Sequence, residues 1–367
     1  MTQSPEFLDE QIDIEEIYEN EDVPFRYTIT NYGADYDVEG LVRRIERGDI
    51  YIPDFQRVYV WDIKRASKFI ESLLLGLPIP GIFLSREEDT QKFIVIDGQQ
   101  RLRTLLYFYK GWFGDAADDK KSVEFKLQGV HKAFEGLTYS RLSEEDRRRL
   151  DNALIHATIV RQDEPEPNAE NSSIYFIFER LNTGGVALKP QDIRSAIYHG
   201  SLNNLLHQLN MENEDWQRLF GKPDKQRRDE ELILRFFALY FWFEQYEEPM
   251  KGFLNSYMAW NRGLDKQSAS KLTTTFNQTV STVLHCLGEK AFKPKRAINA
   301  AIFDAIMVGV ARRLEQGEIQ NCLLLRERYN DLLNDTAFQQ DVGSGTANRE
   351  KVQRRIELAT QAFADVE

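Results

Sequence analysis

The sequence FIVIDGQQRLRTLLYFY, residues 93–109, decides the fold of the first half of the chain. Its first four residues are apolar and suit a buried strand, and from Leu102 onward apolar residues recur with helical spacing. An Asp-Gly pair at 97–98 separates the two patterns. The stretch therefore predicts an apolar strand that turns directly into a helix.

The flanking sequence supplies further strands and helices of a mixed domain. A strand at 82–84 and the polar residues 85–91 predict a hairpin with the strand at 93–96. Asp62 is placed to cap a helix that ends at Gly76. Further predicted elements are a helix from Val38 to Ile45 stopped by Gly48, strands at 123–127 and 153–160, and a helix that begins at Ser143.

A break in composition divides the chain near residue 165. Residues 163–168 contain two prolines and no apolar side chain, and the pattern beyond them is helical. We therefore predict an α+β protein with an acidic, disordered tail at 1–25, a mixed domain at 26–165 and an α-helical domain at 166–367. Helices are predicted at 174–180, 191–199, 229–246, 253–260, 272–288, 297–315, 318–334 and 351–363.

The net charge of −12 is concentrated at the N-terminus. Residues 1–25 hold nine acidic side chains and no Lys or Arg, so residues 26–367 carry 50 acidic and 47 basic side chains, a net charge of −3. Most basic clusters of this body alternate with acids, as solvated helix faces do. Charge therefore neither establishes nor excludes nucleic-acid binding. The tail is interpreted as a solubilising extension, with the alternative that it mimics a polyanion and covers a basic cleft.

Composition excludes several classes of protein. The acidic N-terminus does not have the pattern of a signal peptide. The most apolar stretch, Leu232 to Phe243, contains Arg235 and is too short for a bilayer, so it predicts a buried helix. Two cysteines, Cys286 and Cys322, cannot build a disulfide framework or a zinc site, and the five histidines lack metal-ligand spacing. We expect a cytoplasmic protein that does not bind membranes.

The junction IDGQQR at residues 96–101 is the strongest candidate for chemistry. The first turn of a helix exposes backbone N–H groups with partial positive charge, and Gly98 would let a phosphate approach them. Arg101 would add a cation, Asp97 could hold a metal ion or orient water, and the glutamines could position that water. The alternative is a plain turn that Asp97 caps. The motif is not a Walker loop.

Two more segments are candidates for the same site. In IPDFQRVYVW, residues 52–61, a proline turn presents Gln56 and Arg57, and Trp61 offers a stacking surface; alternatively its aromatic residues pack in the core. In FERLNTGGVAL, residues 178–188, a Gly-Gly loop exposes backbone amides that form either an anion nest or a helix C-cap.

The order and spacing of these motifs resemble the N-terminal domain of GmrSD-type modification-dependent restriction enzymes, a family of the ParB/sulfiredoxin-like superfamily found in bacterial phage-defence loci. The resemblance covers residues 38–200 and rests on IPDFQRVYVW, SLLLGLPIPGIFL, VIDGQQRLRTL and FERLNTGGVALKPQDIRSAIY. RRDEELILRFFALYF and MKGFLNSYM also resemble single-domain members. The resemblance to this family implies a ParB/sulfiredoxin-like mixed domain followed by an all-α domain.

The resemblance ties the Asp-Gly-Gln-Gln-Arg motif to hydrolysis of a nucleoside triphosphate (NTP) of unspecified base. It implies a catalytic set of Asp97, Gln99, Gln100 and Arg101. The implied nucleotide-binding residues are Gln56, Arg57, Gly98, Asn182, Thr183, Gly184 and Gly185. Mg²⁺ is the expected metal, with Asp97 as a candidate ligand.

The histidines after residue 200 do not match the two-domain relatives, which carry a C-terminal nuclease of the HNH type. Such a site needs a histidine base and further ligands close by. After residue 200 this chain has only His207 and His285, which we interpret as structural. We therefore expect a stand-alone member that does not cleave DNA by itself.

The functional expectation is a nucleotide-binding, NTP-hydrolysing component of a bacterial anti-phage or restriction system. Hydrolysis would gate DNA targeting or a partner nuclease. Two alternatives remain: a non-hydrolysing DNA-binding sensor that uses the same cleft, and a ParB-like nuclease that acts on DNA. The expected partners are a nucleotide, DNA, a separate nuclease or methyltransferase-system protein, and a second copy of the chain.

Overall fold

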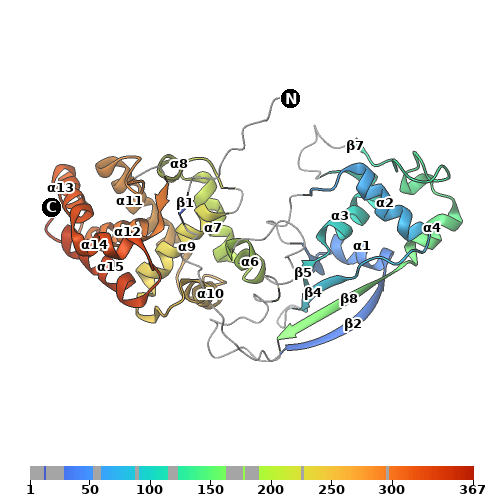
Figure 1. Ribbon diagram of the computed structural model, residues 1–367, viewed down its shortest axis with the longest axis horizontal. Helices are drawn as coiled ribbons and strands as arrows, with labels where there is room; N and C mark the ends of the chain where they lie inside the picture. The colour runs from blue at the N-terminus through green and yellow to red at the C-terminus, as the bar shows by residue number, and fades with distance from the viewer. Residues whose placement is uncertain are drawn as a thin grey trace.

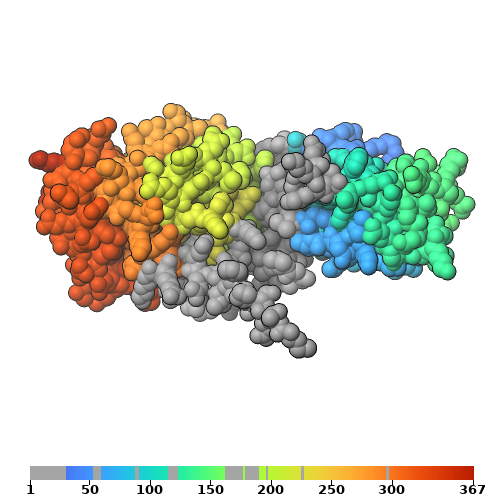
Figure 2. All heavy atoms as spheres, turned by 90° about the horizontal axis from the view of Figure 1, so that it is seen from above, coloured from blue at the N-terminus to red at the C-terminus, as the bar shows by residue number. Residues whose placement is uncertain are grey.

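The chain forms a mixed lobe followed by a helical lobe. The computed structural model describes residues 12–13, 29–52, 59–86, 91–114, 123–162, 177, 190–224, 227–294 and 297–367. Figure 1 shows the sheet and its helices, blue to green, at one end and the helical lobe, yellow to red, at the other; the space-filling view separates the same colours (Figure 2). The α+β class is thereby confirmed. The predicted domain limits at 25 and 165 lie outside the described residues.

The mixed lobe is built on a five-stranded sheet with the strand order β2-β8-β4-β5-β3. Its strands are β2 (Ile29–Asp37), β3 (Ile50–Tyr51), β4 (Ile82–Arg86), β5 (Phe93–Asp97) and β8 (Leu154–Gln162). β4 and β5 pair antiparallel, which confirms the predicted hairpin, whereas β8 runs parallel to β4 and β3 runs parallel to β5. A separate ladder joins β6 (Trp112–Phe113) to β7 (Val123–Glu124), so the strand predicted at 123–127 is confirmed only at its first two residues.

Helices cover one face of this sheet (Figure 1). They are α1 (Val38–Glu46), α2 (Ile63–Leu74), α3 (Gln99–Lys110) and α4 (Glu144–Asp151), with a 3₁₀ turn at Tyr139–Arg141. Along β8, Ile155, Ala157 and Ile159 are buried in the same apolar cluster as the helices, while His156 between them is exposed. Asp62 and Ser143 cap α2 and α4 as predicted.

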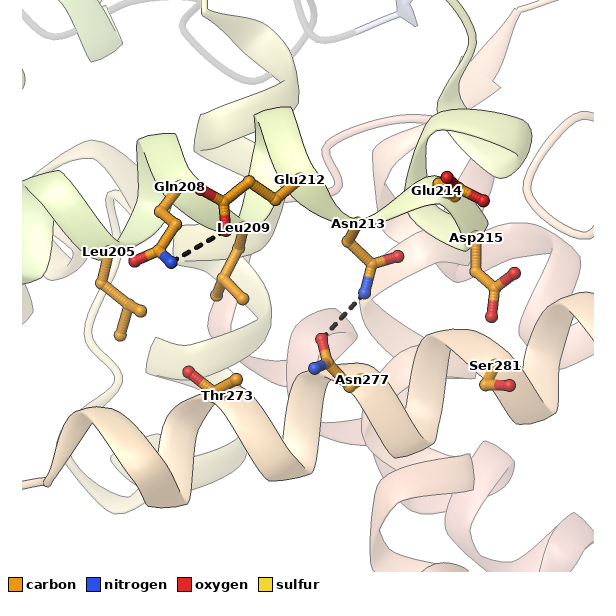
Figure 3. A pocket seen from close by; sticks show the side chains of 10 residues that line it. All are labelled: Leu205, Gln208, Leu209, Glu212, Asn213, Glu214, Asp215, Thr273, Asn277 and Ser281. Atoms are coloured by element: carbon orange, nitrogen blue, oxygen red, sulfur yellow. Dashed lines mark hydrogen bonds between the residues drawn. The ribbon is translucent and has the colours of Figure 1, made fainter.

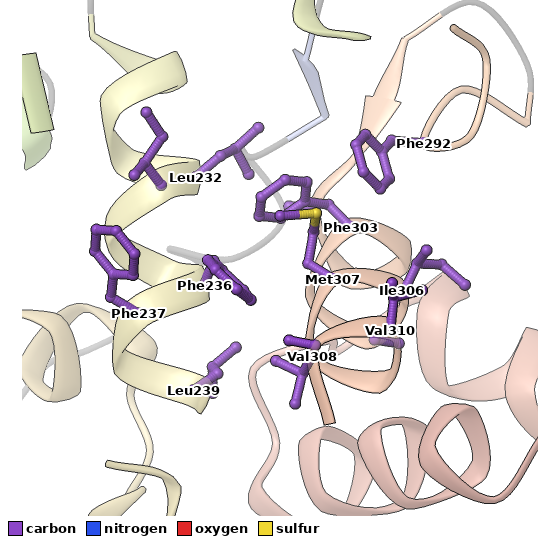
Figure 4. Close-up of a cluster of buried hydrophobic side chains, with 14 of the residues drawn as sticks. Leu232, Phe236, Phe237, Leu239, Phe292, Phe303, Ile306, Met307, Val308 and Val310 are labelled. Carbon is purple, nitrogen blue, oxygen red and sulfur yellow. The ribbon is translucent and has the colours of Figure 1, made fainter. Parts of the chain in front are cut away.

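The helical lobe is organised around two central helices. Its helices are α6 (Pro190–Ile197), α7 (Ser201–Glu212), α8 (Glu214–Phe220), α9 (Arg228–Phe241), α10 (Met250–Trp260), α11 (Ala269–Leu287), α12 (Ala300–Leu314), α13 (Cys322–Asn334), α14 (Thr336–Gly343) and α15 (Arg349–Phe363), with a 3₁₀ turn at Phe243–Gln245. In Figure 4, Leu232 and Phe236 of α9 face Phe303 and Met307 of α12 across the core. All four side chains are buried.

Arg235 lies within the apolar face of α9 and is paired there with a carboxylate. Its Nε donates to Oδ1 of Asp304 at 3.0 Å, and Arg355 donates to Oδ2 of the same carboxylate at 2.8 Å. The three side chains are buried, so the ion pairs explain how α9 accommodates a charge. The prediction of a buried helix at 232–243 is confirmed as far as Phe241. In the described part of the chain, no helix has the length and apolar character needed to cross a membrane.

The N-terminal segment contributes a strand to the helical lobe. β1 (Ile12–Asp13) pairs in parallel with β9 (Ile298–Asn299), which leads into α12. The remainder of the segment predicted to be a disordered tail lies outside the described residues. The other unpredicted link is a single disulfide between Cys286 of α11 and Cys322 of α13, whose Cα atoms are 4.7 Å apart.

Candidate functional site

Gly98 turns the chain from β5 into α3. Its φ of +104° lies in the left-handed region that glycine adopts easily. A Cβ atom added to Gly98 would lie 2.4 Å from Cγ2 of Ile82 in β4. Backbone conformation and packing therefore both require glycine. Because Gly98 gives α3 no side-chain cap, no cap neutralises the partial positive charge of the helix N-terminus.

Arg101 holds this junction together. Its Nη2 donates to Oδ2 of Asp97 at 2.8 Å and to the carbonyl oxygen of Gly81 at 2.9 Å. One guanidinium thus ties the end of β5 to the residue before β4. The Arg101 side chain is only 15% exposed, whereas that of Asp97 is 42% exposed. The guanidinium of Arg101 is therefore held in place, but it is already paired with the Asp97 carboxylate.

The two glutamines of the junction differ in their surroundings. Oε1 of Gln100 accepts hydrogen bonds from the backbone N–H groups of Val60 at 3.1 Å and Trp61 at 3.3 Å. Oε1 of Gln99 is buried and has no hydrogen-bond partner among the described residues. Gln100 therefore anchors the chain that follows residues 53–58, whereas Gln99 keeps an acceptor that a ligand or water could use.

Two residues that the sequence analysis did not single out support this anchor. Oγ1 of Thr104 donates to the carbonyl oxygen of Gln100 at 2.7 Å and lies 2.7 Å from the hydroxyl of Tyr59. Because the threonine proton is already used, the tyrosine must be the donor in the second bond. Burial, which outweighs the bond to Thr104, raises the pKa of Tyr59 to about 12, so the phenol stays protonated at neutral pH.

The structure brings part of the predicted site together. Asp97, Gly98, Gln99, Gln100 and Arg101 form the β5–α3 junction. The other predicted residues, Gln56, Arg57, Asn182, Thr183, Gly184 and Gly185, lie outside the described residues. Their involvement stays a prediction.

Helix α6, which follows the predicted glycine loop, is fixed to the helical lobe. It spans Pro190–Ile197, where the sequence predicts a helix at 191–199, and its proline occupies a position that a helix start tolerates. Arg194 forms a buried ion pair with Glu231 of α9. Just beyond α6, the ring of His199 packs against Tyr51 of β3 with 4.6 Å between ring centroids. The two lobes therefore meet where α6 ends.

A polar groove of about 550 Å³ lies between α7, α8 and α11, away from the junction. Figure 3 shows Asn213 reaching Asn277 across it, with 2.8 Å between Nδ2 and Oδ1. Three of its lining residues are acidic: Glu212, Glu214 and Asp215. Carboxylates repel phosphate, so the groove is a poor site for a triphosphate despite its size.

The described residues also limit where a metal could bind. Among them, no three His, Cys, Asp or Glu side chains are grouped so that they could hold a metal ion. His207 instead lies 2.8 Å from Oε1 of Glu230, which also pairs with Arg227. Asp97 supplies a single half-exposed carboxylate at the junction. A single carboxylate fits Mg²⁺, which binds proteins through one or two carboxylates and substrate phosphates.

The sheet and its junction define a mixed α+β domain with a glycine at a strand-to-helix turn. Residues 38–199 match the family described as the N-terminal domain of the GmrSD restriction endonuclease. This segment, which contains the junction and α6, is thus similar to that domain, in agreement with the resemblance seen in the motifs. No curated protein and no solved structure matches the chain.

Proposed function

We propose that this chain is a nucleotide-binding NTP hydrolase of an anti-phage restriction system, with the phosphates at Asp97–Arg101. The observation that carries the proposal is the Gly98 turn, which starts α3 without a side-chain cap next to a fixed arginine. The family of residues 38–199 supports the restriction context. In this proposal hydrolysis gates DNA targeting or a partner nuclease.

The junction residues take separate roles in this proposal. Gly98 supplies the left-handed turn that starts α3 without a side-chain cap. Arg101 contributes positive charge and is kept in position by Asp97. Gln99 offers its buried Oε1 as an acceptor that orients water. Gln100 acts by holding the chain at Val60 and Trp61 against α3.

The remaining predicted residues would complete the site from two neighbouring segments. Gln56 and Arg57 precede the chain that Gln100 anchors, and residues 182–185 precede α6, which Arg194 anchors. Mg²⁺ would be held by Asp97 together with phosphate oxygens, and it would neutralise the charge on those oxygens.

Release of inorganic phosphate from an NTP mixture with Mg²⁺ tests the proposal. We expect turnover by the wild type and about a 100-fold loss in Asp97→Ala and Arg101→Ala, the size seen when one transition-state contact is removed. Arg148→Ala is the matched control, because Arg148 and Glu144 also form an i,i+4 pair but lie exposed on α4. Equal turnover in all four proteins would overturn the proposal.

A sensor without hydrolysis is the second candidate. It is favoured by the bond between Arg101 and Asp97, because a bound phosphate would compete with that carboxylate for the guanidinium. Such competition would make the junction responsive to the ligand. Nucleotide binding that depends on Arg101, with no phosphate released, is the outcome expected for a sensor.

A further inference from the structure

Two residues of the acidic N-terminal segment, 12–13, pair with a strand of the helical lobe. Ile12 pairs with Ile298 and Asp13 with Asn299 in a parallel ladder. Figure 1 places β1 among α7, α8 and α9, whereas β2, the next described element of the chain, lies in the mixed lobe. β1 therefore pairs with β9 in one lobe, although β2, the next described element of the chain, lies in the other lobe.

β9 is held in place by the helical lobe and pairs along one edge with β1. Ile298 is buried in the core of the helical lobe. The side chain of Asn299 accepts a hydrogen bond from the Ile302 N–H and donates to the Val342 carbonyl oxygen, both at 3.0 Å. Its backbone N–H donates to Phe292 at 2.9 Å. β9 is thus also fixed by bonds that do not involve β1, which suits an edge for strand addition.

The sequence just before β9 is basic. Residues 290–296 contain Lys290, Lys293, Lys295 and Arg296, with no acidic residue among them. Lys290 is exposed, and Nζ of Lys293 donates to the neutral carbonyl of Phe220 at 3.1 Å. Neither lysine forms an ion pair with a carboxylate of the described residues. Residues 1–25, with nine acids and no Lys or Arg, are electrostatically complementary to this run.

We propose that β9, together with Lys290 and Lys293, forms a docking site for the acidic N-terminal segment of the same chain. Ile12–Asp13 binds by strand addition, and the surrounding acids add charge attraction. A two-residue ladder is weak alone, but the covalent tether keeps the segment at a high effective concentration. The docking involves neither the junction nor the nucleotide, so it stands independently of the proposed function.

Binding in trans tests the docking site. A fluorescent peptide of residues 1–22 is titrated into the chain that lacks these residues. We expect saturable binding that high salt weakens several-fold. Ile12→Pro in the peptide should abolish it, because proline cannot donate to the ladder. Ile17→Pro, in the same peptide but outside β1, is the matched control. Absence of binding at low salt, or equal binding by both proline peptides, would overturn the proposal.

A footprint on the full chain gives a second test that needs no truncation. Hydrogen–deuterium exchange of the peptide 297–302, which contains β9, is compared with that of the peptide 93–97 of the mixed lobe. Loss of the ladder should speed exchange in the β9 peptide several-fold in Ile12→Pro and leave it unchanged in Ile17→Pro. Exchange of the β9 peptide that is the same in all three proteins would contradict docking.

Discussion

Gly98 combines a left-handed backbone with a close approach to Ile82. We expect Gly98→Ala to lower the free energy of unfolding by about 2–4 kcal/mol, because backbone strain and overpacking each cost roughly 1–3 kcal/mol. Gly76→Ala is the control: its φ is +70°, but an added Cβ meets nothing within 4 Å. It should therefore cost only about 1–2 kcal/mol. Urea denaturation measures both losses, and equal values would show that the Ile82 contact contributes nothing.

Residue-level prediction succeeded where the signal is local. The junction from Asp97 to Arg101 is contiguous, and its strand and helix patterns place it correctly. The ion pair between Asp97 and Arg101 also has a local signal, the i,i+4 spacing. Tyr59 and Thr104 were missed because their hydrogen bond joins residues 45 positions apart. No sequence pattern within either segment reports such a contact.

At the scale of elements, local capping signals predicted helix starts better than helix ends. Asp62 and Ser143 were identified as caps, and the structure confirms both. The helix predicted to continue to residue 246 ends at Phe241, where Trp242 leaves helical geometry. Helices α7, α8 and α14 were not predicted. α8 has only seven residues, too few for a clear periodicity.

The buried ion pair between Arg194 and Glu231 joins α6 to α9. Arg194→Met leaves the Glu231 carboxylate buried without this partner, so we expect a loss of about 3–5 kcal/mol in the free energy of unfolding. Arg218→Met is the control, because Arg218 and Glu289 are 60% and 58% exposed and such a pair contributes at most about 1 kcal/mol. A loss in Arg194→Met as small as in the control, again measured with urea, would mean that α6 is held by other contacts.

At the scale of the whole molecule, the two lobes have separate hydrophobic cores. One core draws on residues between Val38 and Ile159, and the other on residues between Tyr198 and Val366. The α+β class and the order of the lobes could be predicted because hydrophobic periodicity is a local property. The β1–β9 ladder could not, because strand pairing depends on Ile298–Asn299 at the far end of the chain.

Because each lobe has its own hydrophobic core, we predict that the two lobes unfold separately. We expect two calorimetric transitions, since each core can be lost while the other persists. Gly98→Ala should lower only the transition of the mixed lobe, and Arg194→Met only that of the helical lobe. A single transition that both variants shift equally would show that the lobes unfold as one unit.

Hydrogen–deuterium exchange of the Asp97–Thr104 peptide, with and without a non-hydrolysable NTP and Mg²⁺, tests most directly where phosphates bind. We predict slower exchange of the amides at the start of α3 in the wild type and no change in Arg101→Ala, because phosphate oxygens would accept from these N–H groups. The peptide across the polar groove, Thr273–Ser281, should not change. Unchanged exchange at the junction of the wild type, or protection confined to the groove, would contradict a phosphate site at Gly98.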